Sequence, residues 1–179
     1  MLANGDLFDT LVEPLLAERT KRVAYIHVDA LRYELGLELQ RQLIDMGTAT
    51  IQPSIAQLPT VTPIGMASLL PGAGKKLEIL SEGKGFVAVL DGQRLTTVVN
   101  RMKVFEQIYG DRFAQMTLSE FNSRKKIKIS DAVNLLVIRS TEIDSHLESN
   151  PETTLGLVHQ TLKGIRVAIH RLRQAGFTD

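Results

Sequence analysis

Two short apolar segments, RVAYIHVD at residues 22–29 and NLLVIRS at 134–140, constrain the fold of this chain more than any other feature. Each is a nearly unbroken run of β-forming residues, which is typical of a strand buried on both faces of a parallel sheet. Helical periodicity follows, over 31–46 after the first run and over 151–175 after the second, and a glycine closes each helix. The alternation predicts an α/β protein with a mostly parallel sheet flanked by helices.

The remaining N-terminal segments fit the same plan. Residues 6–19 predict an amphipathic helix. Its apolar positions are Leu7, Leu11, Leu15 and Leu16. A weaker strand is predicted at 48–55, and a short helix begins near Pro63, because proline is favoured in the first turn of a helix.

The middle of the chain breaks the alternation of strands and helices. Residues 84–99 predict a β-hairpin, with Asp91-Gly92 supplying the turn, and two helical segments follow at 99–110 and 117–126. We therefore expect one domain over 1–179. Its core would comprise 21–72 and 130–179, and an inserted hairpin and helix segment would occupy about 73–129.

Composition restricts the class of protein. Hydrophobic residues make up 44% of the 179 residues and charged residues 23%, which is ordinary for a globular domain, and the formal net charge of +1 implies no polyelectrolyte partner. Cysteine is absent, so disulfides and thiolate metal sites are excluded. Without a signal peptide or a membrane-spanning run, the expected location is the cytoplasm, with no membrane partner.

Polar side chains gather where the predicted strands end. Asp29 ends the first strand, and Thr60 and Thr62 lie in the loop after the second. The third strand leads into STEIDSHLES, which carries Asp144, His146 and Glu148. Ligands of open α/β sheets bind outside the carboxyl ends of the strands, and these donors suit a divalent metal ion.

Each of these residues also has a purely structural interpretation. Asp29 and Thr62 both precede helices and are favoured N-cap residues. A hydroxyl at a helix start can equally serve as a nucleophile, particularly when a metal ion binds it. Arg32 could contact a phosphate group or pair with a neighbouring acid such as Glu34. The basic segment 124–128 is either a solvated loop or a contact for nucleic acid.

Three stretches together carry a family resemblance: VAYIHVDALRYELGLEL, LPTVTPIGMASLLPG and LLVIRSTEIDSHLES. They resemble the PglZ domain of the alkaline phosphatase superfamily, which occurs in the BREX anti-phage defence systems. The resemblance implies an alkaline-phosphatase-like fold and hydrolysis of phosphate esters or phosphodiesters, possible nucleic acid substrates included, with two divalent ions, typically zinc. It also implies other defence-system proteins as partners.

The resemblance also implies roles for individual residues. Asp29 would bind one metal ion, Thr62 would be the nucleophile bound to that same ion, and Asp144 would bind the other. Glu148 holds the position of a second ligand four residues past Asp144, with His146 as the alternative. Arg32 matches no family role, and its phosphate contact rests on chemistry alone.

One departure from the superfamily pattern affects the expected activity. The superfamily completes its metal site with an Asp-His-Gly sequence on a later strand and a further histidine, and no such sequence occurs here. We therefore expect the parent protein to be a metal-dependent phosphohydrolase, and the 179-residue chain alone to be inactive and to bind metal weakly. The alternatives are a non-catalytic scaffold within a defence complex and, less favoured by the net charge, a nucleic-acid-binding module.

Overall fold

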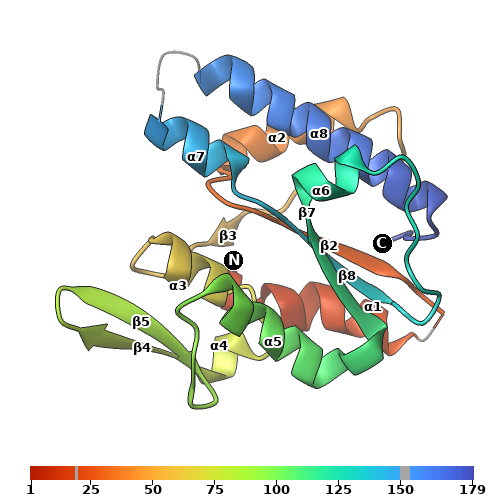
Figure 1. Ribbon diagram of the computed structural model, residues 1–179. Helices are drawn as coiled ribbons and strands as arrows, with labels where there is room; N and C mark the ends of the chain where they lie inside the picture. Colours follow the sequence, from red (N-terminus) through yellow and green to blue (C-terminus); the bar gives the residue numbers. More distant parts are fainter. Residues whose placement is uncertain (19, 150–153) are drawn as a thin grey trace.

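The centre of the structure is a three-stranded parallel sheet, in the order β2 (Val23–Val28), β8 (Leu135–Ser140) and β7 (Phe113–Thr117). The computed structural model (Figure 1) describes residues 1–18, 20–149 and 154–179, without the side chains of 146–149, 154 and 155. Strands β2 and β8 are in register along their whole length, from Val23 opposite Leu135 to Val28 opposite Ser140.

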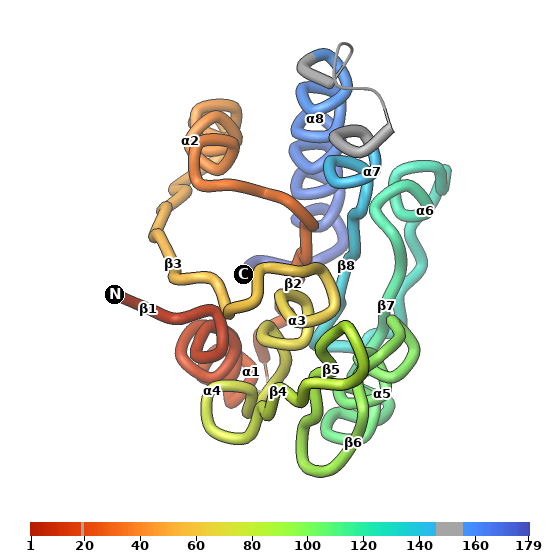
Figure 2. The backbone as a smooth tube through the Cα atoms, turned by 90° about the vertical axis from the view of Figure 1, so that its left-hand side faces the viewer, coloured from red at the N-terminus to blue at the C-terminus, as the bar shows by residue number. Residues whose placement is uncertain are grey.

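Helices cover both faces of this sheet. Helices α1 (Glu13–Ala17) and α5 (Val98–Tyr109) lie on one side, and α2 (Tyr33–Gln42), α6 (Leu118–Ser123) and α8 (Thr154–Gln174) lie on the other (Figure 2). Successive residues of β8 therefore point into two different cores. Leu135 and Val137 pack in the first, and Leu136 and Ile138 pack in the second. Burial of β8 on both faces explains its unbroken apolar sequence.

A separate antiparallel sheet comprises β4 (Leu77–Glu82), β5 (Gly85–Leu90) and β6 (Gln93–Arg94), and extends away from the central layers (Figure 1). Asp91 and Gly92 make the turn between β5 and β6 with φ of 48° and 77°, as the sequence predicts. A short parallel pair joins β1 (Leu2–Ala3) to β3 (Ser54–Ile55). The α/β class is confirmed. The sheets are mixed, so the predicted mostly parallel character is not confirmed for the chain as a whole.

Two strands differ from the sequence-based expectation. The predicted strand at 48–55 is reduced to Ser54–Ile55, outside the central sheet. Strand β7 lies within the range 73–129 that we assigned to an insertion, yet it pairs with β8 in the central sheet. The division of the chain into core and insertion stays a prediction, and β7 argues for an insertion that ends before Phe113.

The remaining helices connect these layers. They are α3 (Thr62–Ala67), α4 (Ala73–Lys76) and α7 (Glu142–Ser149). After α8 the chain returns to the sheet, where the Thr178 N–H donates to the Arg22 carbonyl at 3.2 Å. Among the described residues, no helix is long and apolar enough to cross a membrane.

The first helix is wound differently from the prediction. A π-helical segment, η2 (Phe8–Val12), precedes α1 and shifts the buried positions to Phe8, Val12 and Leu16. Leu11, predicted on the apolar face, is 43% exposed. Phe8 is fully buried, and its ring lies 5.5–6.1 Å from the rings of Tyr25, Phe105 and Tyr109. Aromatic packing at Phe8 thus determines which face of this helix is buried.

This packing predicts a large difference between two substitutions in the same helix. Phe8→Ala should lower the free energy of unfolding by about 3–5 kcal/mol, because it removes a buried ring and leaves a cavity. Leu11→Ala, the matched control, should cost less than about 1 kcal/mol. Urea unfolding followed by circular dichroism measures both. Equal losses would contradict the helix phase described above.

Candidate phosphoryl-transfer site

The carboxyl ends of β2 and β8 lie side by side and form one rim of the molecule. The Asp29 N–H donates to the Ser140 carbonyl at 2.9 Å and so extends the pairing of the two strands by one residue. Helix α7 begins two residues after Ser140, and Asp144 lies in its first turn. Strand pairing therefore fixes where Asp29 and the start of α7 lie relative to one another.

Asp29 is held at this rim by an unusual backbone turn. Its side chain is largely buried, with 8% of the residue exposed, and its Oδ1 accepts a hydrogen bond from the Ala30 N–H at 3.0 Å. Ala30 has a φ of 58°, a left-handed conformation that costs a non-glycine residue about 1–2 kcal/mol. Helix α2 begins only at Tyr33, and no side chain caps it. Asp29 is thus not the cap of α2, and the alternative structural interpretation of this residue is wrong.

Thr62 lies against Asp29. Helix α3 has Val61 at its N-cap and no side-chain cap, so Thr62 is its first residue and does not cap it. Its hydroxyl instead interacts with the Asp29 carboxyl group and lowers the pKa of that group. Val61 and Thr62 are both exposed on this side of the rim. The hydroxyl therefore lies beside a buried carboxylate and remains accessible.

The electrostatics of the rim bring Asp144 into the same site. Burial raises the pKa of Asp29, and the nearby negative charge of Asp144 raises it further. Hydrogen bonds from Thr62 and from the Ala30 N–H, together with the positive charge of Arg101, lower it in part. A buried carboxyl group beside a second carboxylate marks a place where a cation would be stabilised.

Arg101 is a site residue that sequence reasoning missed. It projects from α5, only 8% of the residue is exposed, and its Nη1 donates to the Leu95 carbonyl at 3.3 Å. Burial lowers the pKa of its guanidinium, the attraction of Asp29 opposes that shift, and the nearby Arg139 adds to it. A signal for it existed, since Arg101 interrupts the apolar face of α5 one turn before Phe105.

His27 lies just behind the rim. It is a core residue, packed edge-on against Tyr25 with ring centroids 4.3 Å apart. Its Nε2 has no hydrogen-bond partner in the described part of the chain. Burial lowers the pKa of His27 to about 3, assisted by the charges of Arg139 and Arg101. The imidazole is therefore neutral at physiological pH.

Other predicted residues have weaker links to the site. Arg32 is exposed, and its Nε lies 3.0 Å from a carboxylate oxygen of Glu34, so its phosphate contact stays a prediction with a competing partner. His146 and Glu148 belong to α7, but their side chains lie outside the described part of the structure.

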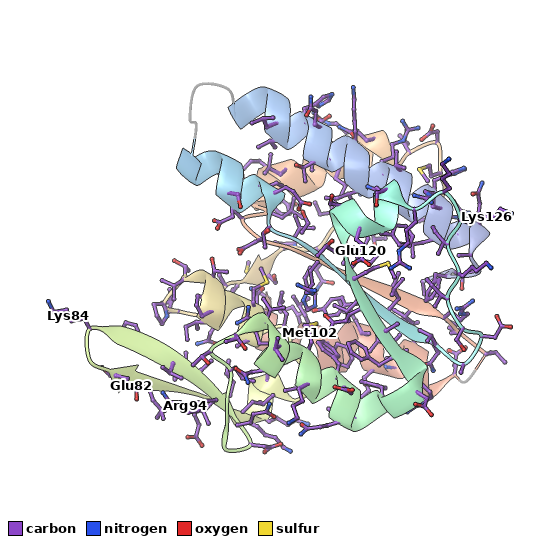
Figure 3. All side chains as sticks on the ribbon, viewed as in Figure 1. Glu82, Lys84, Arg94, Met102, Glu120 and Lys126 are labelled. Carbon is purple, nitrogen blue, oxygen red and sulfur yellow. The ribbon has the colours of Figure 1, made fainter. Side chains whose placement is uncertain are left out.

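The basic segment 124–128 lies away from the rim. It follows the end of α6 and leads to the amino end of β8, opposite the carboxyl ends of the strands. Arg124 pairs with Glu120 at 2.5 Å, and Figure 3 shows Lys126 on the far side of the molecule from the hairpin tip at Lys84. The segment therefore forms no part of the site around Asp29.

The donor set can be compared with the metal site that the sequence predicts. Asp29, Thr62 and Asp144 supply hard oxygen ligands of the kind divalent cations accept. Within the described residues, however, no group of three or more histidine, aspartate, glutamate or cysteine side chains could hold a metal ion. These residues thus fit part of a coordination shell.

The fold and the site together define a class of protein: an α/β domain in which a threonine hydroxyl lies beside a carboxylate near the carboxyl ends of the strands. The chain belongs to the PglZ family, described as the BREX system PglZ alkaline phosphatase-like domain, whose sequence profile matches residues 7–176. It is 25% identical over 171 residues to the alkaline phosphatase-like protein BrxZ of Escherichia coli O9:H4 (strain HS). The match covers 94% of this chain and 19% of that relative, so the chain spans about a fifth of its length.

The buried carboxylate predicts a pH-dependent cost in stability. Because folding raises the pKa of Asp29, its ionised form destabilises the folded state at pH values above that pKa, and the cost disappears as the pH falls through it. Asp29→Asn keeps the acceptor oxygen without the charge. In the presence of a chelator it should raise the free energy of unfolding at pH 7 by about 0.5–2 kcal/mol.

Urea unfolding at pH 7 and at successively lower pH measures this effect. Asp131→Asn, at an exposed turn, is the control and should change stability by less than about 0.5 kcal/mol. A destabilised Asp29→Asn protein at pH 7 would show that the carboxylate contributes to stability, contrary to the electrostatics described above.

Proposed function

We propose that this domain forms the core of a metal-dependent phosphohydrolase of an anti-phage defence system, acting in the cytoplasm on phosphate esters or phosphodiesters. One observation carries the proposal: the pKa of Asp29 responds both to the Thr62 hydroxyl and to the charge of Asp144, so the three side chains lie in one site at the rim. These are the three residues for which the sequence suggested a nucleophile and two metal ligands. Membership of the PglZ family supports phosphatase-like chemistry.

Thr62 would act as the nucleophile. Its hydroxyl lies beside the Asp29 carboxyl group and is exposed, so a lone pair of Oγ can face a substrate. As the bond from Oγ to phosphorus forms, the bond from phosphorus to the departing oxygen breaks. The hydroxyl proton leaves to water, and the departing oxygen takes a proton from water. A water molecule then cleaves the threonine–phosphorus ester and restores Thr62, releasing phosphate from a monoester substrate or a phosphate monoester from a diester.

Divalent ions would complete this site. Asp29 and Thr62 would hold one ion and Asp144 the other, with Glu148 or His146 as a further ligand and zinc as the expected metal. Bound ions supply a Lewis acid that favours the threonine alkoxide and neutralises charge on the phosphoryl oxygens. The described residues of this chain provide the nucleophile and its orientation, and only part of the ligand set.

A non-catalytic scaffold within the defence complex is the second candidate. It is favoured by the lack of a group of three or more histidine and acidic ligands in the part of the chain that the structure describes. Under that proposal the rim would be a retained structural corner, and contacts with other defence proteins would be the function. Hydrolytic activity of the whole protein that contains this domain separates the two candidates.

The phosphohydrolase proposal predicts that Thr62→Ala abolishes turnover. In the whole protein loaded with zinc, kcat for a chromogenic phosphodiester should fall by about 10³-fold or more, because the nucleophile is lost. Thr62→Ser, which keeps a hydroxyl, should retain measurable turnover.

Thr60→Ala provides the matched control, because Thr60 is an exposed threonine of the same loop. It should leave kcat unchanged. Turnover by Thr62→Ala at the rate of the unmodified protein would remove Thr62 from the proposed role, and a whole protein without any hydrolytic activity would favour the scaffold.

A further inference from the structure

Arg101 is a buried cation with little local compensation. Only 8% of the residue is exposed, and the guanidinium, which carries five N–H donors, makes one hydrogen bond, to the Leu95 carbonyl, among the described residues. No carboxylate of the described residues lies within 4.0 Å of it. Burying a guanidinium without a close anionic partner costs stability. The N–H donors of Arg101 that have no partner among the described residues are therefore available to bind an anion.

The packing of α5 against β2 places this cation beside the rim. The two elements run in opposite directions (Figure 1), and the Phe105 ring lies 6.1 Å from the His27 ring. Arg101 is one turn before Phe105, about 6 Å back along the helix. Asp29 is two residues past His27, about 6.6 Å forward along the strand. These two displacements have similar lengths and point the same way. Because Phe105 lies beside His27, Arg101 therefore lies beside Asp29.

The charge of Arg101 is only partly compensated by its surroundings, because Asp29 attracts it while Arg139 repels it. Arg139 lies opposite His27 in the register of β2 and β8, and its positive charge opposes that of Arg101. Asp29 attracts Arg101, but Asp29 is itself engaged by Thr62 and the Ala30 N–H. The Arg101 guanidinium adds positive electrostatic potential near the Thr62 hydroxyl. The apolar side chains around it have a low dielectric constant, which strengthens this potential.

We propose that Arg101 binds the phosphoryl group of the substrate, its guanidinium contacting non-bridging oxygens of a phosphate ester attacked by Thr62. This inference rests on the proposed function and adds a residue to it from α5, an element outside the motifs that carry the family resemblance. Arg101 takes the role considered for Arg32, which is exposed and already paired with Glu34. Guanidinium groups suit this task because their fork geometry matches two phosphate oxygens at once.

The direct test is the affinity for inorganic phosphate, measured by calorimetry on the zinc-loaded whole protein. Arg101→Met keeps the side-chain length without the charge and should raise the dissociation constant by about tenfold or more. Arg101→Lys should restore part of the affinity, because it returns the charge without the fork. Lys103→Met, an exposed residue of the same helix, is the matched control and should bind phosphate as the unmodified protein does.

Two further measurements distinguish binding from a structural role. Zinc content should be unchanged in Arg101→Met, and added guanidinium ion should strengthen phosphate binding by Arg101→Ala but not by Lys103→Met. Equal dissociation constants for the unmodified protein and Arg101→Met, or no phosphate binding by either, would overturn the inference. Arg101-dependent binding together with a fully active Thr62→Ala protein would overturn the proposed function and leave the phosphate site in place.

Discussion

The parallel pairing of β2 with β8 is the interaction on which the rest of the structure depends. The two strands are in register from Val23 to Val28, and the hydrogen bond from the Asp29 N–H to the Ser140 carbonyl continues the pairing to the rim. Because β8 is buried on both faces, its position is determined by two separate cores. The carboxylate at the end of β2 and the helix after β8 are therefore presented from a rigid base, as preorganised chemistry requires.

Several residues at the rim adopt conformations or environments that are energetically unfavourable for their type. Asp29 is buried near another carboxylate, Ala30 adopts a left-handed backbone, and Arg101 is a cation in a largely apolar layer. His27 adds a ring nitrogen without a described partner. Each feature costs stability, and such costs concentrate at functional sites because selection there acts on chemistry.

Much of the site could be predicted from sequence because its residues lie at the ends of strongly apolar strands. Asp29 and Asp144 follow from that rule, and the structure brings them together with Thr62, which follows a predicted strand that is not part of the central sheet. The choice between cap and site residue could not be made from position, since α2 begins four residues after Asp29 and α3 begins at Thr62 itself. Strand β7 was missed because FAQMT is short and only partly buried. Arg101 was missed because its role depends on how α5 packs on β2.

The central claim is that Thr62 is the nucleophile at a rim built by Asp29 and Asp144. Trapping the covalent intermediate tests it most directly: the zinc-loaded whole protein is mixed with excess phosphodiester, quenched in acid within one turnover, digested and analysed by mass spectrometry. The account predicts one phosphoryl-containing group on the peptide that carries Thr62, absent without substrate. Turnover with no modified peptide, or with the group on a different residue, would contradict it.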